Sequence, residues 1–265
     1  MKAIKDCKPM NKEEAEATYY FVETNILPLI SAYNYSHIGS FGKKELINDL
    51  DIAVIHDSIY DAQKILVENG YKVIAIPGFN QITLGVPFPG DNEWIAQVDL
   101  MFTHSILWCQ WAYFSPNQYE SKYKGVHRNA FISSIISEMD KEITKWNGDK
   151  IEEYEHTVIR FHSGIWKVKK TYKGKTGLVK TPKIIDEKLL TNDPFRAAII
   201  MLGNGQDIET FSFEEIWKWF ISDLFPYKGR EIKIMTKLRR HLDNAKLEYP
   251  KEIMKSGYST LFLKN

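Results

Sequence analysis

The chain has 265 residues, of which 44% are hydrophobic and 26% charged, and its formal net charge is +1. This is the composition of an ordinary folded, soluble protein. Two cysteines, Cys7 and Cys109, exclude a disulfide framework and a dedicated zinc cage. No apolar run reaches the ~18 residues of a membrane span, and the N-terminus lacks the apolar core of a secretory signal. We therefore expect a cytoplasmic protein with no membrane partner.

The first half of the chain alternates between helical and extended patterns. The predicted elements are a helix over 11–33, a strand over 35–38, a strand over 50–55, a helix from Ser58 to Gly70, and strands over 71–76, 81–86 and 94–102. Ser58 is a typical helix N-cap, and Gly70 is a typical stop. This order predicts a mixed α/β sheet flanked by helices, the α/β (α+β) class.

The pattern changes after residue 104, where an aromatic stretch leads to Ser115-Pro116-Asn117. The predicted elements beyond it are a helix over 126–145, a β-hairpin over 157–173 that turns at Gly164, and helices over 193–202, 212–224 and 231–242. We therefore predict a catalytic domain over residues 1–116. A mainly helical region with a basic β-hairpin, over residues 117–265, is expected to bind nucleotide and acceptor.

Three aspartates carry the most informative chemistry. Asp49 and Asp51 are two residues apart in a predicted strand, so their side chains project from the same face. Asp99 stands between apolar residues in a later strand, with the apolar side chains on the other face. Neighbouring carboxylates repel one another unless a cation neutralises them. Magnesium binds carboxylates together with substrate phosphates, so the pattern predicts a magnesium site.

The order of these motifs resembles that of the DNA polymerase beta-like nucleotidyltransferase superfamily. A strand ends in Gly39-Ser40, Asp49-Leu50-Asp51-Ile52 follows, and Asp99 lies on a later strand. The resemblance covers roughly residues 20–103. It implies that Gly39 and Ser40 hold the nucleotide phosphates, that Asp49 and Asp51 bind two Mg²⁺ ions (or Mn²⁺), and that Asp99 binds the catalytic ion and assists deprotonation. Eight residues separate Ser40 from Asp49, fewer than is usual in the superfamily, which leaves the details of phosphate binding open.

Basic residues outside the core motif are further candidates. Lys43 follows the Gly-Ser turn, while Lys124 and Arg128 flank the start of a predicted helix, where cations and the helix dipole both favour a triphosphate. Each has an alternative interpretation as a solvated charge or a structural ion pair. The segment 160–183 holds eight basic residues and no acidic one, interleaved with aromatic residues. That combination suits single-stranded nucleic acid, although a hairpin with a wet, lysine-rich face explains it equally well.

The implied reaction is nucleotidyl transfer from a nucleoside triphosphate to an acceptor hydroxyl, with release of pyrophosphate. The basic hairpin favours RNA, such as a tRNA-like end, as the acceptor. A toxin-type transferase that modifies a protein is the second enzymatic interpretation. A nucleotide- or RNA-binding module without turnover is the non-enzymatic one. Metal-dependent pyrophosphate release separates the enzyme from the binding module.

Overall fold

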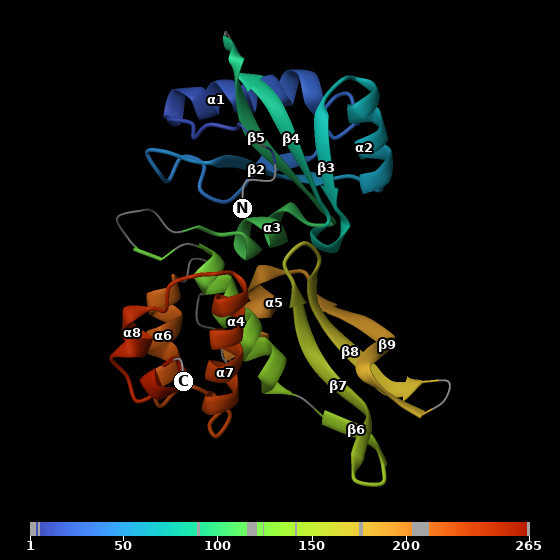
Figure 1. Cartoon of the computed structure of the whole chain (residues 1–265), viewed down its shortest axis with the longest axis vertical. Coiled ribbons are helices and arrows are strands. Elements are labelled where there is room, and N and C mark those ends of the chain that lie inside the picture. Colours follow the sequence, from blue (N-terminus) through green and yellow to red (C-terminus); the bar gives the residue numbers. More distant parts are fainter. Residues whose placement is uncertain are drawn as a thin grey trace. The chain divides into compact units, whose positions relative to one another are not determined.

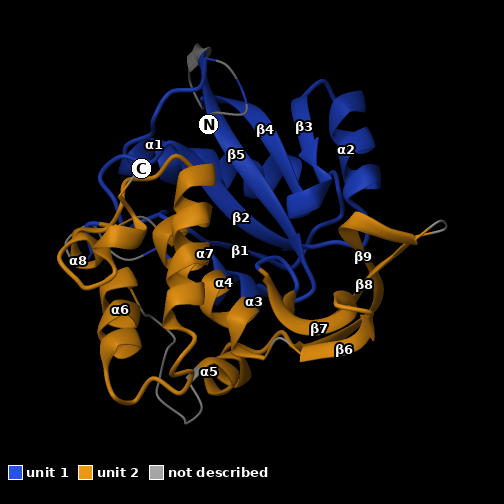
Figure 2. Cartoon of the chain, turned by 60° about the horizontal axis from the view of Figure 1, so that its bottom comes forward, with its two compact units in different colours: residues 1–122, 161–163 blue, residues 123–160, 164–265 orange. Residues whose placement is uncertain are grey.

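The structure is a computed structural model that describes residues 4, 6–88, 91–115, 121–123, 125–140, 142–174, 177–202 and 212–263. The chain forms two compact units, coloured separately in Figure 2. Met1–Lys122 and Phe161–Ser163 form the first unit, while Tyr123–Arg160 and Gly164–Asn265 form the second. The boundary predicted between residues 116 and 117 falls in a segment, 116–120, outside the described residues.

A mixed five-stranded sheet forms the centre of the first unit (Figure 1), which confirms the predicted α/β class. The strands are β1 (Tyr35–His37), β2 (Asp49–Ile55), β3 (Lys72–Ile76), β4 (Gln81–Phe88) and β5 (Asp91–Thr103), in the order β1-β2-β5-β4-β3. β2 and β5 run parallel, whereas every other neighbouring pair is antiparallel. This parallel pairing places residues from distant parts of the sequence opposite one another.

The helices of the first unit begin at residues suited to capping. They are α1 (Lys12–Phe21), which continues into a π-helical turn (Val22–Ile26), α2 (Ile59–Glu68) and α3 (Ile106–Ala112); a 3-10 turn (Pro77–Phe79) precedes β4. Asn11 caps α1 in a capping box with Glu14, and Ser58 caps α2. The helix predicted over 11–33 ends early, because Pro28 has no N–H to continue the hydrogen bonding.

Alternate residues of the sheet build the main core of the first unit. The apolar side chains of β2, β4 and β5 point to one face, which α1, its π-helical turn and α2 cover; they include Leu50, Ile52, Val54, Ile82, Leu84, Val86, Val98, Leu100 and Phe102. Each of these side chains is buried, and burying one stabilises the fold by roughly 1.5–3 kcal/mol. A one-residue slip in β2 or β5 would expose this set, so the register of both strands is fixed.

The second unit combines helices with a four-stranded antiparallel sheet. Its helices are α4 (Gly125–Met139), α5 (Pro194–Leu202), α6 (Phe213–Ile221), α7 (Glu231–Asn244) and α8 (Lys251–Met254), followed by a 3-10 turn (Ser259–Leu261). Its strands are β6 (Glu142–Asn147), β7 (Lys150–Arg160), β8 (Gly164–Gly174) and β9 (Gly177–Thr191), paired in chain order. Among the described residues, no helix combines the length and the apolar character needed to cross a membrane.

The structure corrects two predictions for this half of the chain. The helix predicted over 126–145 is too long: α4 ends at Met139, and residues 142–147 form β6 instead. The sheet also has four strands rather than the two of the predicted hairpin. Most side chains of β6 and β9 are exposed, so neither strand has the periodic burial that marks a strand in a sequence. The region is therefore less helical than predicted.

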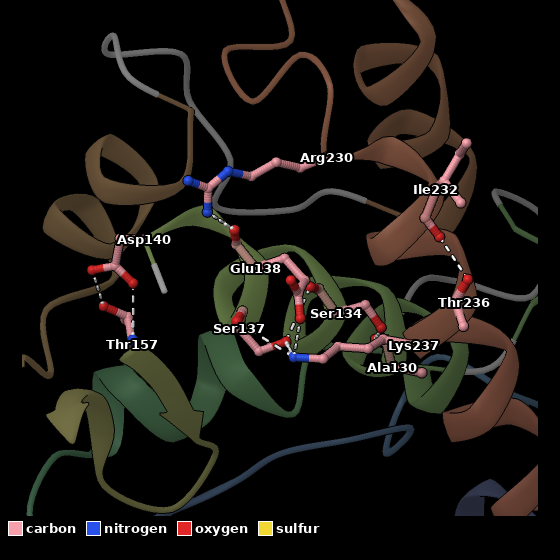
Figure 3. A network of polar contacts seen from close by, with 10 residues as sticks. All are labelled: Ala130, Ser134, Ser137, Glu138, Asp140, Thr157, Arg230, Ile232, Thr236 and Lys237. Atoms are coloured by element: carbon pink, nitrogen blue, oxygen red, sulfur yellow. Dashed lines mark hydrogen bonds and ion pairs between the residues drawn. The ribbon is translucent and has the colours of Figure 1, made fainter. Parts of the chain in front are cut away.

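Polar contacts fix the C-terminal end of α4 (Figure 3). Lys237 of α7 forms an ion pair with Glu138, and Arg230 donates a hydrogen bond to the Glu138 carbonyl oxygen. Immediately after the helix, the carboxylate of Asp140 accepts hydrogen bonds from the Thr157 amide at 2.9 Å, the Thr157 hydroxyl at 2.7 Å and the Lys167 ammonium at 2.7 Å. Asp140 thus anchors the end of α4 to β7 and β8, and the chain turns into β6.

We predict that Asp140→Asn destabilises the protein in a pH-dependent manner. Burial alone would raise the pKa of Asp140, but hydrogen bonds from Lys167 and Thr157 outweigh it and lower the pKa below 3.8. The stabilisation is therefore present above pH 3.8 and is lost as the pH falls through the pKa of the folded state. At pH 7 the loss should be about 1 kcal/mol, because the carboxylate is 37% exposed and solvent screens its ion pair.

Chemical denaturation of both proteins at pH 7, 5 and 3.5 measures this effect. The difference in unfolding free energy between wild type and variant should shrink at the lowest pH. Asp149→Asn, in the exposed turn between β6 and β7, is the matched control and should cost little at any pH. A pH-independent loss for Asp140→Asn would show that the ionised form of Asp140 is not what stabilises this junction.

Candidate active site

Three aspartates share the face of the first sheet that lies opposite the α1–α2 layer. Asp49 and Asp51 alternate with buried Leu50 on β2, and Asp99 lies on β5 directly opposite Asp51 in the parallel register. Asp99 is 7% exposed, whereas Asp49 and Asp51 are partly exposed. The apolar residues that alternate with the aspartates, Leu50 and Ile52 on β2 and Val98 and Leu100 on β5, are buried in the core and therefore direct the carboxylates to the opposite face. We call this surface the carboxylate face.

The turn after β1 packs closely against one of these carboxylates. Gly39 has φ +70°, a left-handed conformation that favours glycine. A Cβ atom on Gly39 would overlap Asp51 Oδ2 and would lie 3.2 Å from Asp51 Cγ. The Ile38 amide donates to the Asp51 carbonyl oxygen at 2.9 Å, and the Lys43 amide donates to the Ser40 carbonyl oxygen at 3.1 Å. Gly39 therefore lies beside Asp51 on the carboxylate face, and Ser40 follows it in the turn.

Mutual repulsion and burial disfavour charge on the carboxylate face. Burial raises the pKa of Asp51 well above 3.8, and the negative charges of Asp49 and Asp99 raise it further. Burial also raises the pKa of Asp99, to about 6, although hydrogen bonds from Thr83 and Gln97 favour its ionised form. A cluster of carboxylates at this cost in stability is typical of a functional site.

Two lysines lie in the loop that follows Gly39 and Ser40. Lys44 lowers the pKa of Asp51, which places its positive charge near the carboxylate face. The Lys43 ammonium lies 4.4 Å from the centroid of the Phe114 ring. Lys43 also contributes, after burial, to the lowered pKa of His37. Lys44 is therefore a cation whose charge acts on Asp51.

Polar residues of β4 and β5 extend the carboxylate face beyond the predicted site. Thr83 lies opposite Asp99 and is fully buried, and its hydroxyl accepts a hydrogen bond from the Gln81 amide at 3.1 Å. The Gln97 amide donates to both carboxylate oxygens of Asp99, at 3.3 and 3.4 Å. The two-residue spacing between Gln97 and Asp99 matches that of Asp49 and Asp51. The alternation of side chains along a strand could therefore have predicted from the sequence that Gln97 lies on the same face as Asp99.

α3 covers the remainder of this side of the sheet. Cys109 packs with Ile38, Ala53 and Met101 in a small apolar cluster. Tyr113, which follows α3, has a raised pKa because of burial and because Cys109 and Asp51 lie nearby. The Tyr113 phenol therefore remains protonated at neutral pH and can donate a hydrogen bond near Asp51.

The donor set of the carboxylate face suits magnesium. Among the described residues, no three His, Cys, Asp or Glu side chains come together as a ready-made metal cage. Magnesium in phosphoryl-transfer sites does not need such a cage, because one or two carboxylates, waters and substrate phosphates complete its coordination. Asp51 and Asp99 are hard oxygen donors whose charges repel, and a divalent cation would relieve that repulsion. The residues present therefore fit Mg²⁺, and Mn²⁺ accepts the same donors.

The predicted nucleotide-binding residues are divided between the two units. Gly39, Ser40 and Lys43 belong to the first unit with the aspartates. Arg128 belongs to α4 of the second unit, where it is 1% exposed, its guanidinium contacts Asn129 Oδ1 at 3.1 Å, and burial lowers its pKa to about 9. Lys124 lies outside the described residues. Contact of Arg128 and Lys124 with a triphosphate stays a prediction.

Comparison with protein families and curated proteins gives no relative for this chain. No model of a protein family matches it, and no curated protein does.

Proposed function

We propose that the protein is a metal-dependent nucleotidyltransferase that moves a nucleoside monophosphate from a nucleoside triphosphate to an acceptor hydroxyl. The observation that carries this proposal is the carboxylate face: Asp51 and Asp99 are opposite each other on parallel strands, with Asp49 on the same face and Gly39 against Asp51. This arrangement occurs on a mixed sheet whose other face is the apolar core. A purely structural role would not require three mutually repelling carboxylates.

Each residue has a role in the proposed reaction. Magnesium bound by Asp49, Asp51 and Asp99 would neutralise charge on the triphosphate. The Gly39-Ser40 turn approaches the phosphates through backbone N–H groups and a hydroxyl. The acceptor oxygen forms a bond to the α-phosphorus, the bond from that phosphorus to the bridging oxygen breaks, and pyrophosphate leaves. Asp99 takes the proton of the acceptor hydroxyl.

Single-stranded RNA is the acceptor that the second sheet favours. Three basic residues of the segment 160–183 form ion pairs: Arg160 with Glu187, Lys167 with Asp140, and Lys169 with Glu153. Lys173, Lys180 and Lys183 have no ion pair with a described residue, and they lie toward the β8–β9 turn near partly exposed Tyr172. We call these three the hairpin lysines. Exposed cations grouped near a turn suit the phosphates of an unpaired strand.

Replacing the three hairpin lysines with glutamate should weaken RNA binding without affecting nucleotide use. We expect at least about a tenfold loss of RNA affinity at low salt. The slope of the logarithm of the binding constant against the logarithm of the salt concentration should become shallower by ~0.7 for each phosphate that is no longer neutralised. Fluorescence anisotropy with a labelled single-stranded RNA measures both quantities. The matched control changes three exposed lysines of the first unit, Lys12, Lys64 and Lys72, to glutamate. Equal losses of RNA affinity in both variants would mean that RNA binding depends on the net charge of the protein and not on the hairpin lysines.

Metal-dependent pyrophosphate release tests the proposed function. The purified protein is incubated with each NTP, magnesium and, in separate reactions, cellular RNA, protein extract and small metabolites. Release with RNA that disappears in Asp49→Ala/Asp51→Ala supports the proposal as stated. Release with protein instead would favour a toxin-type transferase. No release with any acceptor would favour a nucleotide- or RNA-binding module and would contradict the proposed function.

A further inference from the structure

Gln97 lies on the carboxylate face and carries a side-chain oxygen with no hydrogen-bond donor among the described residues. Its side chain is buried, with only 4% exposed, on β5 between Asp49 of β2 and Gly85 of β4 in the sheet register. Its amide nitrogen is committed to Asp99, at 3.3 and 3.4 Å from the two carboxylate oxygens. Its amide oxygen Oε1 is buried and accepts no hydrogen bond from any described residue.

The surroundings explain why the described protein offers this oxygen no donor. The neighbours on this face are the carboxylates of Asp49 and Asp99, which accept hydrogen bonds when ionised, and the apolar side chain of Ile95, which offers no donor. The Thr83 hydroxyl donates to Asp99, and the Gln81 amide donates to Thr83. Gly85, opposite Gln97 on β4, has no side chain. Leaving a buried acceptor unsatisfied costs about 1–3 kcal/mol.

Flipping the side-chain amide of Gln97 does not give its oxygen a hydrogen-bond donor. Exchanging the oxygen and nitrogen of Gln97 would place Oε1 against the Asp99 carboxylate, where two acceptors would repel each other. The hydrogen bonds to Asp99 therefore fix which way the amide points. A group that satisfies Oε1 must carry a hydrogen-bond donor and must also tolerate several adjacent carboxylates. Water bound to a divalent cation meets both requirements, because magnesium keeps several of its waters in protein sites.

We propose that Gln97 is a positioning residue of the metal site: Oε1 accepts a hydrogen bond from a water of the bound cation, while the amide nitrogen orients Asp99. This inference rests on the proposed function, since it assumes that the carboxylate face binds a cation. Residues that hold metal ligands or metal-bound water from outside the coordination sphere typically change metal affinity by 10–100-fold. Gln97 should therefore matter for metal binding even in the absence of nucleotide.

Binding of Mn²⁺ alone, followed by electron paramagnetic resonance, tests this inference without relying on activity. Gln97→Met keeps the length of the side chain but removes both polar atoms, and should weaken Mn²⁺ binding about 10–100-fold. Gln97→Glu retains an oxygen at the position of Oε1 but replaces the amide nitrogen that orients Asp99 with a second oxygen, so it should bind Mn²⁺ more tightly than Gln97→Met. Gln63→Met is the matched control: it removes an amide of α2, which packs on the opposite face of the sheet, and should change affinity by less than about threefold.

The outcomes separate this inference from the proposed function. Mn²⁺ binding by wild type, its loss in Asp51→Asn and its weakening in Gln97→Met would support both. Binding that is unchanged in Gln97→Met, or equally weakened in Gln97→Glu, would overturn the role of Oε1 and leave the proposed function intact. No Mn²⁺ binding by wild type would contradict the metal site itself, and the inference with it. Circular dichroism spectra ensure that only folded variants are compared.

Discussion

Asp51→Asn should abolish nucleotidyl transfer and, at the same time, raise the melting temperature of the metal-free protein. The loss of activity follows from the removal of a central charge of the carboxylate face. Stabilisation of negative charge by a metal ion is worth several kcal/mol in the transition state, which corresponds to about 10³-fold or more in rate. A residue that only supported the fold would lower both activity and stability.

The gain in stability follows from the sign of the pKa shift. Burial, Asp49 and Asp99 raise the pKa of Asp51 above 3.8 in the folded state. The folded protein therefore binds this proton more tightly than the unfolded chain does, and its stability falls as the pH rises above 3.8. Asparagine does not titrate and does not repel the two neighbouring carboxylates. Each kcal/mol that Asp51→Asn adds to the free energy of unfolding should raise the melting temperature by about 2–4 °C at neutral pH.

Thermal melts in EDTA at pH 7 and pH 4, with parallel activity assays, measure both effects. The stabilisation should be larger at pH 7 than at pH 4. Asp57→Asn, an exposed residue two positions beyond β2, is the control and should alter neither activity nor melting temperature by much. A lower melting temperature for Asp51→Asn would show that the carboxylate stabilises the fold rather than serving a site.

Gly39→Ala should damage the site far more than Gly42→Ala. Both glycines have nearly the same left-handed backbone, with φ +70° and φ +71°, so alanine at either position carries a similar backbone cost of about 1–2 kcal/mol. A Cβ on Gly42 meets nothing within 4 Å, whereas a Cβ on Gly39 overlaps the Asp51 carboxylate. The difference between the variants therefore isolates the contact with Asp51.

We expect Gly39→Ala to lose at least about 10²-fold in transfer rate, because small misplacements at an active site have effects of this size. Gly42→Ala should be destabilised but should retain most of its activity. Denaturation curves and initial rates of both variants provide the comparison. Equal activities would mean that the approach of the Gly39 turn to Asp51 has no part in the reaction.

The first unit could largely be predicted from sequence because its strands alternate between apolar and polar residues. Leu50 and Ile52 define the buried face of β2, which fixes Asp49 and Asp51 on the other face. The same alternation places Asp99 on β5. The position of each aspartate on the polar side of its own strand follows from this local pattern alone. Parallel pairing of β2 with β5 depends on contacts between distant segments and could only be inferred through the family resemblance.

The second unit was harder to predict because two of its strands are poorly buried. Ile184 and Ile185 are adjacent in β9, and each is 50% exposed, so no alternation appears. The end of α4 depends on Asp140, whose partners Thr157 and Lys167 are distant in sequence. The unsatisfied side-chain oxygen of Gln97 could not be predicted from the sequence either, because the orientation of the amide depends on its hydrogen bond to Asp99.

The most direct test of nucleotidyl transfer uses one NTP labelled either at the α-phosphate or at the γ-phosphate. With magnesium and RNA, the α-label should appear in the acceptor and the γ-label should appear in pyrophosphate. Both should require magnesium and disappear in Asp49→Ala/Asp51→Ala. Transfer of the γ-label to the acceptor, or release of the γ-label as free phosphate from wild type and variant alike, would contradict the assignment of the carboxylate face as a nucleotidyltransferase site.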